Sequence, residues 1–312
     1  SRVDMIDEEI LYWMRKAGCI QISYGVEHGS PKIRRLLNKN LKTEDIERAF
    51  ALTPYYGMMS RAYFIYGCPG ENRDTVRESI ELMRRIKPLG AIFYILDIFP
   101  GTALYEDFKR RHNVTDHVWL NRIEDILYFE TDPHLSREQV MSFGRELRAA
   151  FYENLSSFVD AVQLVDKPDL FPQHADFLSR LAMTFDHGEY AAIDAVRGKS
   201  DIVRKLYRRA LAYHPDARAY LGLGILNQKE GRYEKSLEIL SEGLQHFPDH
   251  EHLNLCLAIS HMNTGEYPEA LSHLLPFQHR DQTLPLIVDC YRALGNSEMT
   301  ARYQKKIQTE LP

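Results

Sequence analysis

The amino-acid sequence predicts an α/β part followed by an all-α part. In roughly the first 110 residues, apolar runs of strand length alternate three times with helical patterns, as in a parallel sheet built from strand–helix units. In roughly the last 115 residues, the same pattern of small and apolar residues recurs after 34 positions, which indicates stacked helical pairs. Pro168 and Pro172 mark a boundary between the two parts.

The composition is that of a soluble globular protein. The chain has 312 residues, of which 44% are hydrophobic and 27% are charged, and its net charge of −5 provides no basic surface for nucleic acid. No apolar run reaches the ~20 residues that span a bilayer. We therefore expect a cytoplasmic protein without a nucleic-acid or membrane partner. The cysteines are far apart in the sequence and predict neither a disulfide framework nor a metal site: Cys19, Cys68, Cys256 and Cys290.

The first strand-to-helix turn is the most informative stretch. A helix over residues 7–18, with Ile6, Ile10 and Met14 on its inner stripe, precedes a strand that begins near Cys19. Residues 24–30 follow, in which Glu27 stands between two glycines, and a new helix is expected to begin after Ser30. Ligands bind at the carboxyl ends of parallel strands, so Glu27 is either a ligand contact or a solvated acid in an ordinary turn.

Further strand–helix units follow in order. The predicted elements are a helix from residue 43 with Ile46, Ala49 and Phe50 inward, a strand over 61–66 with a loop over 67–71, a helix over 74–87, a strand over 91–96 buried on both faces, a turn over 99–102, a helix over 103–111, extended structure within 113–135, and a helix from 136 to about 160. A closed barrel needs about 250 residues. This region is therefore a small open sheet or half of a barrel.

The C-terminal repeat is most evident in two segments whose sequences align at a constant spacing. Residues 220–224, 231–233 and 240 align with residues 254–258, 265–267 and 274, each pair being 34 residues apart. A related helix over 198–215 precedes them, and a shortened unit over 284–307 follows. This pattern resembles the tetratricopeptide repeat, and the alternative is a generic array of helical hairpins. Small residues such as Gly224, Ala258 and Ala270 are expected to let neighbouring helices approach closely.

Several segments of the first 115 residues resemble the radical S-adenosylmethionine (SAM) enzymes, in particular the branch that often carries an upstream cobalamin domain. The segments are residues 2–4, 16–19, 24–31, 37–39, 64–71 and 99–105, while residues 129–131 and 148–152 resemble the segment that commonly comes after the barrel in that branch. The resemblance implies a partial (βα) barrel that this chain enters at a strand over Ser1–Asp4. It also implies a [4Fe–4S] cluster on a Cys-x3-Cys-x2-Cys loop, which this sequence lacks.

The same resemblance assigns candidate SAM contacts. Glu27 would accept hydrogen bonds from the ribose hydroxyls, and Arg2 and Lys39 match polar contacts to the ribose or carboxylate end, although both are also ordinary surface charges. Tyr63 stands where the family often has glycine, whereas Ile65 and Gly67 keep the pattern. Leu96 and Asp97 would lie against the adenine, with core packing as the alternative for Leu96. No catalytic residue or metal ligand is identified.

The resulting prediction is the C-terminal part of a radical SAM enzyme whose repeats bind a protein or peptide partner. Its expected domains are half of a radical SAM barrel over 1–115, an extension and linker over 116–172, and tetratricopeptide-like repeats over 173–312. The full-length parent would cleave SAM, and this fragment alone would be inactive. The alternatives are a non-catalytic scaffold with a vestigial half-barrel and a nucleotide-binding open sheet. The substrate does not follow from the sequence.

Overall fold

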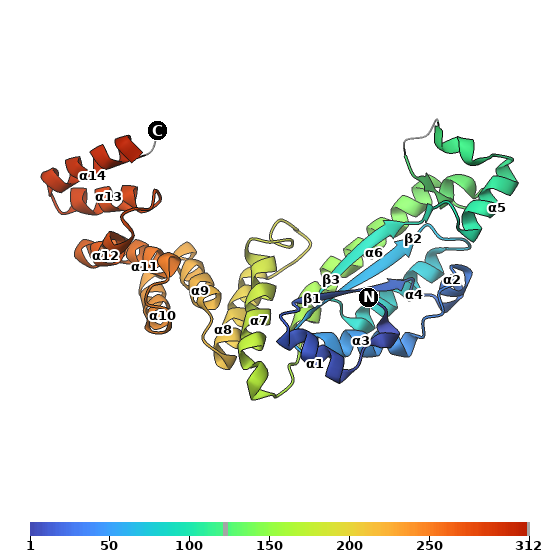
Figure 1. Cartoon of the computed structure of the whole chain (residues 1–312), viewed down its shortest axis with the longest axis horizontal. Helices are drawn as coiled ribbons and strands as arrows, with labels where there is room; N and C mark the ends of the chain where they lie inside the picture. Colours follow the sequence, from blue (N-terminus) through green and yellow to red (C-terminus); the bar gives the residue numbers. More distant parts are fainter. Residues whose placement is uncertain (121–123, 311–312) are drawn as a thin grey trace. The chain divides into compact units, whose positions relative to one another are not determined.

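The chain forms two compact units in the computed structural model, which describes residues 1–120 and 124–310 (Figure 1). The first unit contains Ser1–Asp166 and Ala192–Gly198, and the second contains Lys167–Ala191 and Lys199–Pro312. The predicted domain limits at residues 115 and 172 stay predictions.

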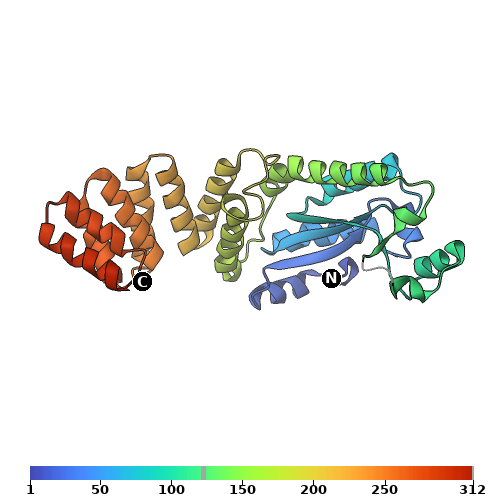
Figure 2. The same cartoon turned by 90° about the horizontal axis from the view of Figure 1, so that it is seen from above.

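The first unit alternates helices and strands and ends in a long helix. Its elements are η1 (Val3–Met5), α1 (Glu8–Lys16), β1 (Gln21–Glu27), α2 (Pro31–Leu36), α3 (Thr43–Tyr55), β2 (Met59–Tyr66), α4 (Arg73–Ile86), β3 (Gly90–Ile95), β4 (Asp97–Ile98), α5 (Ala103–His112), η2 (Asp116–Leu120), β5 (Ile126–Leu127), η3 (Tyr128–Thr131) and α6 (Arg137–Asp160). Strands β1, β2 and β3 form one parallel sheet in that order (Figure 2), which confirms the predicted α/β class.

One face of this sheet is covered and the other is partly open. Side chains alternate along β1 and β2, so that Tyr24 and Phe64 lie in the core while Gly25 and Tyr63 lie on the open face. Helices α3, α4 and α6 pack around the covered face, where the Tyr24 hydroxyl lies 2.7 Å from Thr53 Oγ1. The open face therefore carries the side chains available to a ligand.

Helix boundaries agree with the sequence where a capping residue is present. Ser136 caps α6 in a capping box with Gln139, and Thr102 caps α5. The inner residues expected for α3, namely Ile46, Ala49 and Phe50, are all buried. The caps at α6 and α5 satisfy backbone amides at these two helix starts.

Four local predictions were wrong. In α1 the buried residues are Leu11 and Arg15, whereas Ile10 is 41% exposed, because the helix turns a neighbouring stripe inward. Residues 3–5 form a 3₁₀ turn instead of the strand over Ser1–Asp4 that the family resemblance implies. Strand β3 is not buried on both faces, as Tyr94 is 51% exposed. Within 113–135, β5 is extended as predicted, whereas η2 and η3 are 3₁₀ turns, and residues 121–123 lie outside the described residues.

The second unit is an array of helices. Its elements are η4 (Pro168–Leu170), α7 (Phe171–Asp186), α8 (Lys199–Tyr213), α9 (Ala217–Lys229), α10 (Tyr233–His246), α11 (Glu251–Thr264), α12 (Tyr267–Leu274), η5 (Leu275–Phe277), α13 (Leu284–Ala293) and α14 (Ser297–Glu310). The starts of α9 and α11 are 34 residues apart, as are those of α10 and α12. The predicted helical-repeat array is therefore confirmed.

Close helix packing holds the array together. A methyl group added at Gly224 would meet the Leu240 side chain at 2.5 Å, so the absence of a side chain is what lets α9 and α10 approach. The Ser236 hydroxyl donates to Gly224 O at 3.0 Å and accepts from the Ser260 hydroxyl at 2.9 Å. The described helices include none that is long and apolar enough to cross a bilayer.

Candidate functional site

Glu27 ends β1 in an unusual backbone conformation. Its φ is 65°, and the amide of His28 donates to Val26 O at 2.8 Å, which closes a three-residue turn around Glu27. The ladder shifts register between Gly25 and Glu27, so that Glu27 lies opposite Phe64. A non-glycine residue at positive φ costs about 1–3 kcal/mol, and such strain is concentrated at functional sites.

The Glu27 carboxylate folds back onto the open face of the sheet. A methyl group added at Gly25 would meet Glu27 Oε1 at 2.7 Å, so the glycine provides the space that the carboxylate occupies. Lys39 Nζ lies 3.2 Å from the same oxygen, with side-chain exposures of 49% for Lys39 and 15% for Glu27. A pair this exposed contributes about 0–1 kcal/mol to stability. Within the described residues, Oε2 of Glu27 has no hydrogen-bond donor.

Strand β2 places the next candidates beside Glu27. Tyr63 and Ile65 point to the same open face and are half-buried, and the Tyr63 ring meets the Tyr94 ring edge-on with centroids 5.9 Å apart. Gly67 follows the strand at φ 75°, where a methyl group would approach Val140 at 3.1 Å. Tyr63 therefore replaces the expected small residue with a ring that packs against β3.

Leu96 and Asp97 lie where β3 passes into β4. The Leu96 amide donates to Tyr66 O at 2.9 Å, and its side chain is 8% exposed. Partial burial raises the pKa of the Asp97 carboxyl, and the nearby Asp125 charge raises it further. Arg2 is bound differently, because its guanidinium donates to Asp4 at 3.0 and 2.7 Å.

Two buried residues that join these loops have no role in the sequence-based prediction. His28 Nε2 lies 2.9 Å from Glu71 Oε1, and both side chains are almost fully buried, at 1% and 0% exposure. The other Glu71 oxygen accepts hydrogen bonds from the amides of Gly67 and Cys68. Glu71 ends the loop after β2. An acidic residue at this place is the sequence feature that could have pointed to the contact between the two loops.

The residues present suit SAM better than an iron–sulfur cluster. An acceptor carboxylate, a lysine and half-buried apolar side chains share the open face at the carboxyl end of the sheet, a donor and acceptor set that matches a nucleoside with hydroxyls. The four cysteines are free and the described residues contain no cluster of three or more metal-binding side chains. These residues therefore do not fit a [4Fe–4S] cluster, which is held by several thiolates.

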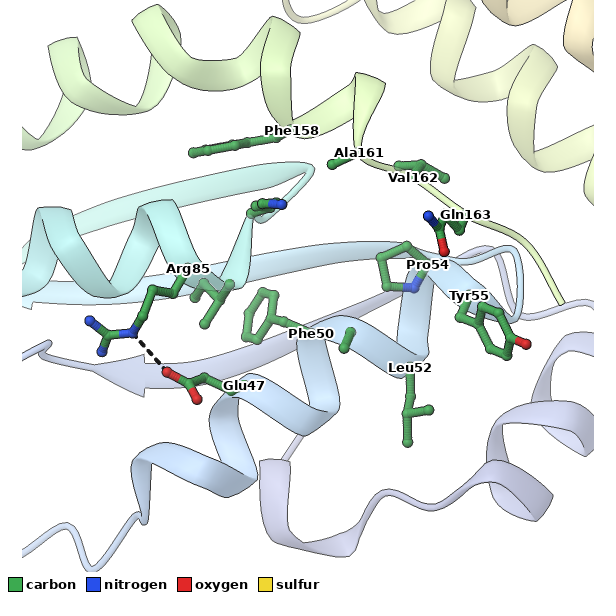
Figure 3. Close-up of a pocket in the computed structure, with 13 residues that line it drawn as sticks. Glu47, Phe50, Leu52, Pro54, Tyr55, Arg85, Phe158, Ala161, Val162 and Gln163 are labelled. Atoms are coloured by element: carbon green, nitrogen blue, oxygen red, sulfur yellow. Dashed lines mark hydrogen bonds and ion pairs between the residues drawn. The ribbon is translucent and has the colours of Figure 1, made fainter.

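A separate cavity of about 440 Å³ lies at the opposite end of the sheet (Figure 3). Phe50 and Phe158 line it, and the Arg85–Glu47 ion pair, with Nε and Oε1 2.8 Å apart, lies on its rim. Its residues 54–55 and 86–87 come just before β2 and β3, which places it at the amino ends of these strands. None of the candidate SAM contacts lines it.

Comparison with known proteins links the first unit to one family. A family model described as the Radical SAM superfamily matches residues 1–83. An uncharacterized methyltransferase of Pyrococcus horikoshii is 26% identical over 157 residues, which cover 49% of this chain and 33% of that protein. An anaerobic magnesium-protoporphyrin IX monomethyl ester cyclase of Rubrivivax gelatinosus is 28% identical over 121 residues, which cover 39% of this chain and 22% of that protein. The chain thus spans a third or less of these relatives.

Solved structures match the chain only loosely. A structure of MamA, described as MamA AMB-1, covers 52% of this chain and 90% of its own with 19% identity and a TM-score of 0.37. PilW, a type IV pilus biogenesis factor, covers 68% of this chain and 96% of its own with 16% identity and a TM-score of 0.38. Likeness at this level says nothing about function. The matched sequence and the parallel sheet lead to one conclusion: residues 1–83 are similar to the radical SAM superfamily, whose family model they match.

Proposed function

We propose that the first unit is the SAM-binding part of a radical SAM enzyme and that Glu27 binds the ribose of SAM. The observation that carries this proposal is the strained Glu27 turn at the carboxyl end of β1, with a carboxylate oxygen that has no donor among the described residues. Lys39 screens the carboxylate charge at its other oxygen. The residues of this unit would hold SAM, and a [4Fe–4S] cluster held outside them would supply the electron that cleaves SAM in this family.

The remaining contacts follow from the open face. Ile65 and Leu96 offer apolar contact to a flat base, and Asp97 offers a hydrogen-bond partner. Gly67 would meet the base through its backbone, because Val140 lies where a side chain at this position would be. The Tyr63 ring, which packs against Tyr94, occupies part of the open face and leaves less space there for a ligand. Arg2 would have to leave Asp4 to reach a ligand.

The experiment is anaerobic reconstitution of the full-length protein with iron and sulfide, followed by titration with SAM and detection of 5′-deoxyadenosine. Glu27→Gln keeps the size of the side chain but removes its charge, and we expect it to raise the Kd for SAM about tenfold, since a charged hydrogen bond is worth about 1.5–3 kcal/mol. Glu47→Gln, which alters an exposed ion pair between α3 and α4, is the matched control and should bind SAM as the wild type does.

Formation of no 5′-deoxyadenosine and equal SAM affinity in both variants would refute the enzyme proposal. In that case the non-catalytic scaffold becomes the better account. A cobalamin cofactor from an upstream domain and a cytoplasmic location stay proposals, and the visible spectrum of the purified full-length protein tests the first.

We also propose that the helical array binds a protein or peptide partner. The support is the 34-residue repeat in the structure, because stacked helical pairs build extended surfaces that many proteins use for binding. Crosslinking of the full-length protein in cells, compared with a form that lacks residues 199–312, tests this proposal. Crosslinked partners that persist without the array would contradict it.

A further inference from the structure

The buried hydrogen bond between His28 and Glu71 connects two loops that each follow a strand of the sheet. His28 comes directly after the strained residue Glu27, and Glu71 closes the loop that begins at Gly67. The two residues are 43 positions apart in the sequence and their side chains meet at 2.9 Å. One buried side-chain pair therefore joins the Glu27 turn to the Gly67 loop, beyond the point where the pairing of β1 with β2 ends.

The hydrogen-bond pattern assigns the tautomer of His28. Its Nδ1 accepts from the backbone amide of Ser30 at 2.9 Å, so the ring proton lies on Nε2 and is donated to Glu71. Glu71 is then satisfied at both oxygens, because Oε2 accepts from the amides of Gly67 and Cys68. A buried carboxylate with these donors orders the loop around it.

The rest of the Glu27 turn is held from the side of α4 and α2. The Gly29 amide donates to Ser79 Oγ at 2.9 Å, and Arg34 donates to the carbonyls of His28 and Gly29 at 2.8 and 3.1 Å. These contacts fix the turn to its own helices. Among these side-chain contacts of the described residues, the pair His28–Glu71 is the one that reaches across to the β2 loop.

We infer that His28 is a positioning residue for SAM binding: through Glu71 it holds the Glu27 carboxylate and the Gly67 loop at the spacing that one ligand molecule needs. This inference rests on the proposed function. A strained turn persists only when its surroundings determine it, and pre-organised groups bind more tightly because less ordering remains for the ligand to impose. Loss of the link should therefore weaken SAM binding even though His28 itself is buried beneath the site.

Two substitutions of His28 distinguish the effect of its hydrogen bond to Glu71 from the effect of its hydrogen bond to the Ser30 amide. His28→Asn keeps an acceptor at the place of Nδ1 for the Ser30 amide but is too short to reach Glu71. His28→Gln places an amide donor where Nε2 lies and restores the contact with Glu71. Tyr24→Phe is the control for stability, because it removes a buried hydroxyl on the covered side of the same strand, with the hydroxyl bond to Thr53 at 2.7 Å.

The measurement is calorimetric titration of the reconstituted full-length protein with SAM. We expect the Kd to rise about tenfold in His28→Asn, equivalent to about 1.4 kcal/mol. The Kd should remain near the wild-type value in Tyr24→Phe. In His28→Gln it should return most of the way from the His28→Asn value to the wild-type value. Equal affinities in wild type and His28→Asn, with Glu27→Gln still impaired, would overturn the positioning role and leave the proposed function intact.

Hydrogen exchange without SAM provides an independent readout. We expect the Gly67 and Cys68 amides to lose protection in His28→Asn although the substitution lies in the other loop, and to regain it in His28→Gln. Unchanged exchange at both amides would refute the coupling between the loops, whatever the protein binds. Normal coupling in a protein that does not bind SAM would instead refute the proposed function.

Discussion

Gly29 has no room for a side chain, and Gly29→Ala therefore tests how the Glu27 turn packs on α4. A methyl group at this position would lie 2.2 Å from Ser79 Cα, 2.4 Å from Ser79 N and 2.5 Å from Glu78 O. All three atoms belong to the backbone of α4, so no side-chain rotation relieves the overlap, and the turn or the helix has to move.

The expected loss is the sum of two effects. Overpacking in a tight site costs about 1–3 kcal/mol, and displacement of the turn breaks the bond from the Gly29 amide to Ser79 Oγ, worth about 0.5–1.5 kcal/mol. We expect a loss of roughly 2–4 kcal/mol in the free energy of unfolding, or a fall in Tm of roughly 4–16 °C for a unit of this size.

Tryptophan emission during thermal unfolding is the assay. Trp13 and Trp119, the chain's two tryptophans, both lie in the first unit, so their emission follows this unit. Ser79→Ala removes only the hydrogen bond and should cost less than Gly29→Ala. The double variant should be no more stable than Gly29→Ala, because the overlap is with backbone atoms. A wild-type Tm in Gly29→Ala, or a rescue by Ser79→Ala, would refute the reasoning.

Three further outcomes are expected. Gly224→Ala should destabilise the helical array by about 1–3 kcal/mol, as measured by urea unfolding, with partial recovery when Leu240 is shortened to Val; loss of stability without such recovery would show that the contact is not with Leu240. Burial, and to a smaller extent the charges of Glu71 and Glu27, raise the pKa of the Cys68 thiol well above its usual value. Cys68 should therefore react with a thiol reagent only when the protein unfolds, whereas the partly exposed Cys19 should react in the native protein. Equal reaction rates of the two thiols in the native protein would contradict this expectation. The pKa of Asp97 is raised in the folded state, so protonation of this carboxyl stabilises the fold at acid pH, and that stabilisation is lost as the pH rises through the folded-state pKa. Asp97→Asn should therefore raise Tm more at pH 7 than at pH 3. An equal change in Tm at both pH values would argue against a raised pKa.

The sequence predicted those features that local patterns determine. Ser30 and Pro31 marked the start of α2, the alternation in β1 was visible, and the 34-residue period predicted both helix pairs. The position of Glu27 at the end of a strand followed from the same patterns, whereas its role in SAM binding stays a proposal.

Features that depend on distant residues were not predictable. The link from His28 to Glu71 joins positions whose proximity is set by the order of strands in the sheet. The positive φ of Glu27 occurs together with the register shift against β2, and no motif in the sequence indicates either of them. The predicted face of α1 was wrong for a different reason: Arg15, a polar residue, is buried while Ile10 is not. Arg15 donates to Cys19 O at 3.0 Å, a local contact that a pattern of apolar residues does not reveal.

The series of hydroxyl hydrogen bonds in the helical array has a consequence for how that part of the protein opens. Gly224 on α9, Ser236 on α10 and Ser260 on α11 are joined by consecutive hydrogen bonds, and Gln228 on α9 also donates to Ser260 Oγ at 2.8 Å. Breaking the contact between the first repeat and the next therefore exposes buried hydroxyl and carbonyl groups along with apolar surface. Because separating neighbouring repeats carries this free-energy cost, we expect α9, α10 and α11 to unfold together in one cooperative step. One helix pair should not unfold before the next.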